Sequence, residues 1–502
     1  MEEKKLQHNE PLAPEEPRVE PDFPMGKQEW IFCAVCLICA VCLANFVLYG
    51  GFALGFAISS LVLTFASFVY LVSRGHKLTA YPGALLVLSM MITAGFARSD
   101  DSFVKFVMLS FLGVSENLGL CLLAGQNRRR SGSFSTIWDA PRALLVLGLG
   151  KMEVTLQSMR RSAKNSGKAG RVGGGLLLGL LLAVPLLAVV ILLLMRADAA
   201  FNGLVGLLPE LDGAEIFGTV ALGAIGFCLL FARAVALHHS EKAPLAEKQR
   251  KGVYPLTVNT VLAALCLVYL VYLYSQLAYF TGGLSGILPE EYTMAQYARQ
   301  GFFEMAWLCA INLATVAIAV GVVEKKEKTP VFTRLLCLFI SLITLFFVVA
   351  ASAKMGMYIG SFGLTRLRVL TEVIMVFLAI TTILVAVWLF VPKMPYMKAV
   401  IIVGLVMGAV VLWVDVDTVV AAYNVSAYQN GLLDTVDVRY LSGLSDGAIP
   451  YIAQLTEDPY AGETARKVLE GFASSRVEDF RDWNYASWLA ECVLWENVHV
   501  WH

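Results

Sequence analysis

The residues best placed to do chemistry in this chain lie in two long apolar segments between residues 259 and 312. In the first segment, Tyr269, Tyr272, Gln276 and Tyr279 recur at steps of three and four residues, which places them on one face of a helix. A polar face on a helix that is otherwise as apolar as lipid indicates contact with a partner or with a wet cavity.

The second segment repeats this arrangement with stronger groups. It opens on Tyr297 and Arg299, and Glu304 falls on one line with Leu308 and Asn312. An ionisable side chain inside an apolar helix is costly unless it faces a partner or water. Glu304 is therefore the centre of the candidate site.

A later segment adds basic residues at a similar expected depth. Thr365, Arg368 and Glu372 share a helical face by their spacing, and Arg366 lies beside them. We expect Glu304 to pair with Arg366 or Arg368 at the wall of an outward-facing polar pocket; an ion pair that only pins helices together is the alternative. The candidate ligand-binding residues are Tyr272, Gln276, Tyr279, Tyr297, Arg299, Glu304, Arg366, Arg368 and Glu372.

Glu116 and Asn117 form a second polar site, deep in the apolar segment 103–125. A proton or cation relay through Glu116 is one interpretation. We favour a hydrogen bond between helices, because no second carboxylate is visible at that depth. The intramembrane polar residues of interest are Glu116, Asn117, Asn259 and Asn312.

Composition places these residues in a membrane protein. Hydrophobic residues make up 58% of the 502-residue chain, and the mean hydropathy is +0.68; soluble domains are about 45–50% apolar. At about 20 residues for each crossing, the apolar runs predict an all-α, polytopic protein with roughly eleven transmembrane helices. Two of these fall within 30–72, and the others lie near 81–96, 103–125, 174–194, 216–237, 254–280, 299–323, 331–351, 367–391 and 397–414.

The polar stretches divide the chain into five expected parts. These are a disordered cytoplasmic tail (1–28), a four-helix membrane region (29–125), a basic cytoplasmic or interfacial segment (126–173), a seven-helix membrane region (174–416) and a small helical extracytoplasmic domain (417–502). In the last part, Trp483, Trp488, Trp495 and Trp501 either pack its helices, which we favour, or rest on the membrane interface.

The distribution of Lys and Arg predicts the orientation, because basic residues near the ends of crossings resist translocation. They gather in alternate loops, among them Arg128-Arg129-Arg130 and Lys325-Lys326, whereas the opposite loops hold mainly acids such as Asp100 and Glu290. The N-terminus is therefore expected in the cytoplasm. An odd number of crossings then places the C-terminus outside the cytoplasm.

Several kinds of chemistry lack their motifs. The sequence has no GxxxxGK[ST] phosphate loop, no HExxH, no GxSxG and no paired Cys/His ligand set. Cys33, Cys36, Cys39 and Cys42 lie every third residue in an apolar run, and we interpret them as a packing stripe instead of a metal or redox site. We expect no cofactor and no metal, and no nucleic acid either, because no binding module accompanies the basic residues.

Three stretches of the C-terminal half resemble a family of bacterial polytopic membrane proteins, the domain of unknown function four-one-seven-three with its relative four-one-five-three. They are VYLVYLYSQLAYFTGGLSGILPEEYTMAQYARQGFFEM, FGLTRLRVLTEVIMV and YNVSAYQNGLLDTVDVRYLSGLSDGAIPYIAQL. The resemblance implies two signatures, formed by Tyr297, Arg299, Gly301, Phe302 and Glu304 and by Gly363, Leu364, Thr365 and Arg368.

Two positions depart from the family pattern. Phe362 stands where the family usually has Tyr, and Ala427 stands where an Arg often follows the Asn-Val of the tail motif, which argues against an Arg-based role there. The family has no known activity. The resemblance therefore implies the fold and a bacterial membrane location more than a function.

Together these observations predict an integral protein of the bacterial cytoplasmic membrane, transporter-like or sensory, with a polar pocket near the outer leaflet for a small solute or a lipid. A different class of function is a structural or regulatory partner that docks an envelope protein through residues 417–502. An intramembrane transferase with Glu304 as base is the third hypothesis. An enzyme is the less favoured class, and we assign no catalytic residue.

Overall fold

The fold was analysed in a computed structural model, which describes residues 25–127, 134–165, 213–240, 252–283, 294–323, 330–475 and 480–498 and the single residues 179, 190 and 194. Within these ranges every regular element is a helix, and one isolated bridge joins Val253 to Val323. The predicted all-α class is confirmed for the described part of the chain.

Nine of the described helices are long and apolar enough to cross a membrane. They are α1 (Lys27–Tyr49), α2 (Leu54–Ser73), α4 (Ser102–Leu123), α9 (Gly213–His239), α10 (Pro255–Gly283), α11 (Met294–Val322), α12 (Val331–Phe362), α13 (Arg366–Phe390) and α14 (Tyr396–Val414). A shorter apolar helix, α3 (Ala80–Gly95), has 16 residues. The polytopic helical architecture is confirmed, and these ten helices correspond to ten of the eleven predicted crossings. The crossing predicted at 174–194 lies outside the described residues.

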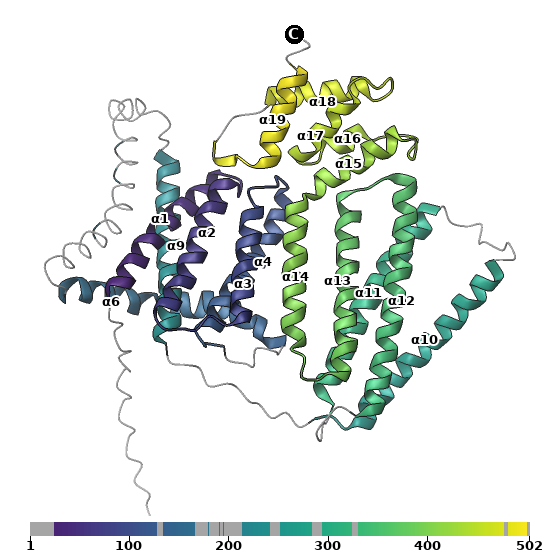
Figure 1. The fold of residues 1–502 in the computed structure, drawn as a ribbon, viewed down its shortest axis with the longest axis horizontal. Coiled ribbons are helices and arrows are strands. Elements are labelled where there is room, and N and C mark those ends of the chain that lie inside the picture. Colours follow the sequence, from purple (N-terminus) through teal and green to yellow (C-terminus); the bar gives the residue numbers. More distant parts are fainter. Residues whose placement is uncertain are drawn as a thin grey trace, which may run out of the picture.

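The helices run up and down, so their ends gather in two layers (Figure 1). One group contains α1 to α4 and α9, and a second contains α10 to α13; α14 packs against α3 and α4 of the first group and against α13 of the second. Contacts fix the two layers: Arg74 at the end of α2 contacts His238 at the end of α9, whereas Glu215 at the start of α9 pairs with Arg481 of the C-terminal region. Gln126, just beyond the end of α4, donates to the carbonyl oxygen of Ser240, just beyond the end of α9. The end of α4 and the start of α9 therefore lie in opposite layers.

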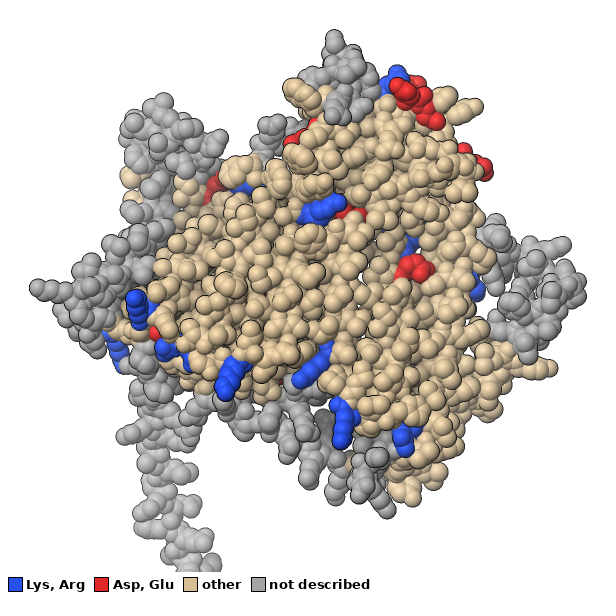
Figure 2. Space-filling view, in the orientation of Figure 1, with Lys and Arg blue, Asp and Glu red and all other residues tan. Residues whose placement is uncertain are grey.

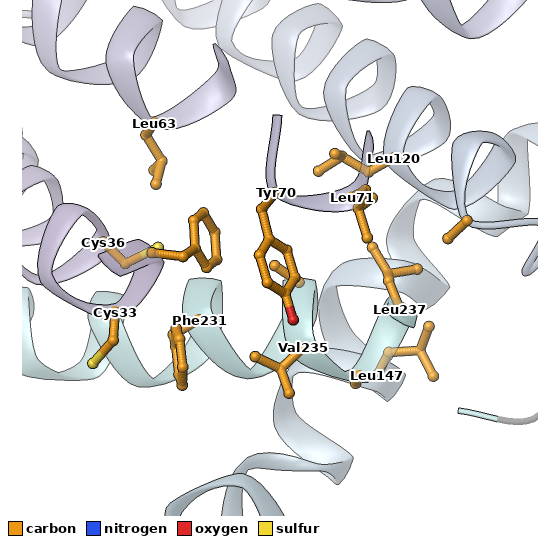
Figure 3. Close-up of a cluster of buried hydrophobic side chains, with 14 of the residues drawn as sticks. Cys33, Cys36, Leu63, Tyr70, Leu71, Leu120, Leu147, Phe231, Val235 and Leu237 are labelled. Carbon is orange, nitrogen blue, oxygen red and sulfur yellow. The ribbon is translucent and has the colours of Figure 1, made fainter. Parts of the chain in front are cut away.

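The core of the first group is built from small and aromatic side chains of α1, α2, α4 and α9. Cys33 lies beside Phe231 in this cluster, and Cys36 and Tyr70 belong to the same cluster (Figure 3). A Cβ atom on Gly223 of α9 would lie 3.0 Å from the Cα atom of Val41, so the helix backbones approach closely. The small residues of α1 thus line a tight contact with α9.

The segment between α4 and α9 includes a short helical layer. It consists of the 3₁₀ helix η1 (Phe134–Trp138), α5 (Asp139–Pro141), the π-helix η2 (Arg142–Leu149) and α6 (Met152–Asn165). Ala143 and Leu147 of η2 are buried, and η2 packs on α9. Leu145, Val146 and Leu149 of the same helix are exposed, so η2 packs on α9 with one side only.

The C-terminal residues form a helical domain at one end of the bundle (Figure 1). Its elements are α15 (Val416–Gln429), α16 (Val438–Ser442), η3 (Asp446–Ala448), α17 (Ile449–Ile452), η4 (Ala453–Leu455), α18 (Gly462–Ser475), η5 (Phe480–Asp482) and α19 (Tyr485–Val498). Ile449, Ile452, Leu469 and Ala490 meet in one buried cluster. The helices thus form a core of their own.

Candidate functional site

The predicted pocket residues lie in three helices, α10, α11 and α13. Gln276 and Tyr279 lie in α10, and Tyr297 and Arg299 lie in α11, but their side chains are outside the described ones. Tyr272 packs edge-on against Phe347 of α12, with the ring centroids 5.4 Å apart. The remaining members of the set are Glu304, Arg366, Arg368 and Glu372.

The side chain of Glu304 is exposed, although Glu304 lies in α11, which is apolar enough to span a membrane. Its charge acts on the ammonium group of Lys354, which is half-buried on the neighbouring helix α12. Glu372 of α13 has one buried carboxylate oxygen, Oε1, without a hydrogen-bond partner in the described part of the chain. This set carries two carboxylates and one ammonium group.

Arg368 closes the end of α12 instead of pairing with Glu304. Its guanidinium donates to the carbonyl oxygens of Phe362 and Gly363 and lies 4.0 Å from the ring centroid of Tyr358. A cation at a helix C-terminus is stabilised by the unpaired carbonyl groups there. Among the described side chains Arg368 therefore acts on a helix end.

The prediction that Glu304 pairs with Arg366 or Arg368 is wrong in its choice of partners. Arg366 binds Asp417 of α15, with Nε 2.8 Å from Oδ1, and its Nε lies 3.1 Å from Oδ2 of Asp101 at the start of α4. Both carboxylates are fully buried. The single Nε–H of Arg366 is donated to Asp417, so the interaction between Arg366 and Asp101 is an ion pair without a hydrogen bond. The arginine thus joins the two helix groups to the C-terminal domain.

Backbone groups complete this junction, which we define as Asp101, Arg366, Asp415 and Asp417. The N–H of Ser445 donates to Oδ2 of Asp417 at 2.7 Å, and the N–H of Arg366 donates to the hydroxyl of Tyr440 at 2.9 Å. The bonds from Arg366 to Asp417 and to Tyr440 connect the start of α13 to the C-terminal domain, and the contact with Asp101 connects α13 to α4. The junction therefore lies at the start of α4, the start of α13 and the end of α14, beside that domain.

Asp415 marks the bend between α14 and α15. Its φ of 59° lies in the left-handed region, which is uncommon for a residue with a side chain. Its carboxylate accepts hydrogen bonds from Ser99, at 2.9 Å, and from Thr418. These bonds hold the strained residue and tie the bend to the end of α3.

Burial changes the acidity of the junction. Burial raises the pKa of Asp415 and of Asp101 above the ordinary aspartate value, although the Asp101 carboxylate also accepts from the N–H groups of Val104 and Phe103. For an acid with a raised pKa, the folded state binds protons more readily than the unfolded chain. Its ionised form therefore costs stability, and protonation removes that cost.

We therefore expect the junction to gain stability as the pH falls from neutral towards the ordinary aspartate pKa of about 3.9. The measurement is thermal unfolding of the purified protein across this window. Asp101→Asn is expected to reduce the change of melting temperature with pH, because it removes one of the two titrating groups. Two results together would contradict the raised pKa values of Asp101 and Asp415. The wild-type protein would lose stability throughout this pH window, and Asp101→Asn would show the same dependence on pH.

Asn424 joins the second and third of the three stretches that carry the family resemblance. Its Oδ1 accepts from the N–H of Leu364 at 2.7 Å, and its Nδ2 donates to the carbonyl oxygen of Leu364 at 2.8 Å. Gly363 precedes this clamp with a φ of +72°, and a Cβ atom there would lie 2.5 Å from Oδ1 of Asn424. Thr365 then caps α13 by accepting from the N–H of Arg368. The Gly-Leu-Thr signature is thus the turn that fits Asn424.

Gly363→Ala is expected to destabilise the protein by about 1–3 kcal/mol, because the alanine must adopt a backbone conformation that is essentially restricted to glycine and also displaces Asn424. Thermal unfolding in one detergent measures the loss. Gly360→Ala is the matched control, since this helical position of α12 has open space around its Cβ. Equal behaviour of the two variants would rule out the clamp.

The second predicted site contains a residue that sequence reasoning missed. Arg233 of α9 donates from Nη2 to Oε1 of Glu116, at 2.9 Å, and from Nη1 to Oδ1 of Asn117, at 2.8 Å. Arg233 is only 1% exposed. The geometry agrees with our favoured interpretation, a bond between helices, and it adds a cation. A single Arg within an apolar run was the available signal.

Asn312 and Asn259 each bond to a neighbouring helix. The hydroxyl of Tyr269 donates to Oδ1 of Asn312 at 2.5 Å, so the polar faces predicted for the two segments meet at this point. Nδ2 of Asn312 has no hydrogen-bond partner among the described residues. Oδ1 of Asn259 accepts from Thr333 at 2.7 Å.

The helices and their buried ion pairs define a polytopic helical protein that resides in a lipid bilayer. Comparison with known families matches residues 80–455 to a domain of unknown function, DUF4153, and the chain belongs to this family. The matched region begins well before the stretches that carried the resemblance and includes Asp101, Arg366 and Asp417. The comparisons found no similar curated protein and no similar solved structure.

Proposed function

We propose that this protein is a transporter-like component of the bacterial cytoplasmic membrane that binds a small solute or a lipid beside α11, α12 and α13, near the outer leaflet. The observation that carries the proposal is the exposed Glu304 carboxylate on a membrane-spanning helix, next to Lys354. Charged groups at such positions are costly, and in membrane proteins they mark substrate pathways. Glu372 supplies an acceptor oxygen that has no hydrogen-bond partner among the described residues.

The two helix groups support a transporter-like rather than a rigid scaffold function. They meet along α14, the first turns of α13 also pack against the first group, and Arg366 joins the groups at the end that carries the C-terminal domain. A small set of ionic contacts at one end of such an interface is suited to opening and closing. In this proposal the junction holds the outer ends of the two helix groups together. A sensory function would use the same opening and closing of the two groups.

The test compares three variants of the purified protein in lipid nanodiscs by native mass spectrometry. Wild-type protein is expected to retain a bound lipid or solute, and Glu304→Gln is expected to lose it. The charge swap, Glu304→Lys with Lys354→Glu, is expected to restore abundance without restoring binding. If the charge swap restores both abundance and binding, the pair of Glu304 and Lys354 has only a structural role and the proposal fails. Glu470→Gln, at an exposed position of α18, is the matched control.

The orientation is part of the same proposal. Lys and Arg side chains line the end of the membrane bundle away from the C-terminal domain, whereas several acidic side chains lie on that domain (Figure 2). Basic residues at crossing ends remain on the cytoplasmic side. We infer that the N-terminus is cytoplasmic and that α15 to α19 lie outside.

This orientation predicts that Tyr460→Cys reacts with a membrane-impermeant maleimide in intact cells, because Tyr460 is 90% exposed on the C-terminal domain. Lys151→Cys, between η2 and α6 at the opposite end, is expected to react only after lysis. Mass spectrometry of the labelled peptides measures both reactions. Reversed labelling would overturn the orientation.

A second candidate function is the docking of an envelope protein through residues 417–502. The observation that favours it is the high exposure of Tyr460 and Leu432 on this domain, at 90% and 73%. A copurifying protein lost from the Tyr460→Ser, Leu432→Ser double variant would support this candidate. Glu304→Gln is not expected to affect that partner.

A further inference from the structure

A short aromatic segment of the C-terminal domain lies across the outer ends of the first helix group. The N–H of Leu54, which begins α2, donates to the carbonyl oxygen of Trp483 at 3.0 Å. The N–H of Tyr485 donates to the carbonyl oxygen of Ala97, just beyond the end of α3, at 2.9 Å. These bonds fix the height of the segment relative to the points where α2 and α3 leave the apolar layer.

Arg481 fixes the same segment to two further helices. Its Nη1 lies 2.8 Å from Oε2 of Glu215, at the start of α9, and its guanidinium lies 5.5 Å from the ring centroid of Tyr49, the last residue of α1. The segment therefore contacts the outer ends of four helices. It lies where the bilayer surface must be.

The aromatic side chains of this segment point away from the protein core. Phe480 is 78% exposed, and Trp483, Tyr485 and Trp488 are exposed as well. Arg98 lies over the Tyr485 ring, with 4.4 Å between the guanidinium carbon and the ring centroid. Packing within the domain, which we favoured from the sequence for these tryptophans, does not account for their exposure.

Exposed apolar side chains of the bundle lie at the same end of their helices as this segment. Leu48 in the last turn of α1, Ile58 near the start of α2 and Phe103 near the start of α4 are exposed at the same end of their helices. Trp and Tyr are enriched at the membrane interface, because their rings are apolar and carry a polar group that remains hydrated. A lipid head-group layer matches both features of this segment.

We propose that Phe480, Trp483, Tyr485 and Trp488 form an interfacial anchor that binds the C-terminal domain to the lipid head-group region of the outer leaflet. Arg98, which lies at the same end of the bundle, is positioned to contact lipid phosphate. The anchor lies beyond residue 455, where the family match ends. It holds the domain against the membrane independently of the polar side of α11 to α13.

The test places a benzophenone amino acid at Phe480 of the full-length protein in phosphatidylethanolamine and phosphatidylglycerol nanodiscs. Irradiation is expected to give several-fold more lipid adduct, measured by mass spectrometry, than the same amino acid at Tyr460. The exposure of both side chains makes these substitutions compatible with folding. Equal lipid adduct at the two positions would overturn the anchor.

A second arm repeats the irradiation in intact cells. There the Phe480 position is expected to give the same lipid adduct and no protein adduct. A protein adduct that replaces the lipid adduct would assign this surface to a macromolecular partner and overturn the proposal. The Glu304→Gln variant is expected to leave the lipid adduct unchanged, so this result is independent of the proposed polar site.

Discussion

Arg366→Gln is expected to lower the free energy of unfolding by about 3–5 kcal/mol, because it leaves buried carboxylates without their cation. Asp101 and Asp417 are fully buried and both face Arg366. Glutamine keeps hydrogen-bonding groups but has no charge to offset the repulsion between the two acids. The loss should appear in thermal unfolding and as faster hydrogen exchange in α15.

The control for this prediction is an ion pair on the protein surface. Lys467 and Glu463 pair on α18 with both side chains exposed, and exposed pairs contribute little to stability. Lys467→Gln should therefore leave both measurements unchanged. If Arg366→Gln behaves like Lys467→Gln, the junction does not hold the C-terminal domain.

The second large effect is expected at Arg233. Arg233→Leu leaves Glu116 uncompensated between apolar helices, and breaking a buried ion pair in this way costs about 3–5 kcal/mol. The double variant, Arg233→Leu with Glu116→Leu, is expected to recover most of this loss, because no unpaired charge remains. Asn117→Ala removes two hydrogen bonds, one from Arg233 and one to the carbonyl oxygen of Gly113, so its cost should be about 2 kcal/mol.

The double variant also separates two roles of Glu116. A protein that is stable but inactive in the assay of bound ligand would indicate that Glu116 takes part in function, as in the relay interpretation. A protein that recovers both stability and binding would show that Glu116 and Arg233 only join α4 to α9. Failure of the double variant to recover stability would contradict the ion-pair account.

Much of the fold was predictable because hydrophobic length is a local property. A run of about 20 apolar residues spans a bilayer whatever it packs against, so the bounds predicted for α13 and α14 agree closely with those of the structure. The two polar faces were also predictable, since the spacing of Tyr269 and Asn312 depends only on helical geometry. Their meeting in one hydrogen bond also required that α10 and α11 turn these faces towards each other, which the sequence did not specify.

The partners of the charged residues were not predictable in the same way. Arg366 and Asp417 are 51 positions apart, and Arg366 and Asp101 are much further apart in the chain. Arg366, Arg368 and Glu304 have the same expected depth, but depth does not specify the rotation of a helix about its axis. The rotation of α13 turns Arg366 towards α15 and Arg368 towards the end of α12, away from Glu304.

The amino-acid sequence alone determined that this protein is helical, that it lies in a membrane and which of its segments carry unusual polar residues, because these properties follow from hydropathy and helical period. Only the tertiary structure decided which charges meet, that Asn424 fits the turn at Gly363, and that the aromatic residues near Trp483 lie exposed at the helix ends. Those outcomes depend on how distant helices pack and rotate against one another, and no local pattern in the chain encodes that rotation.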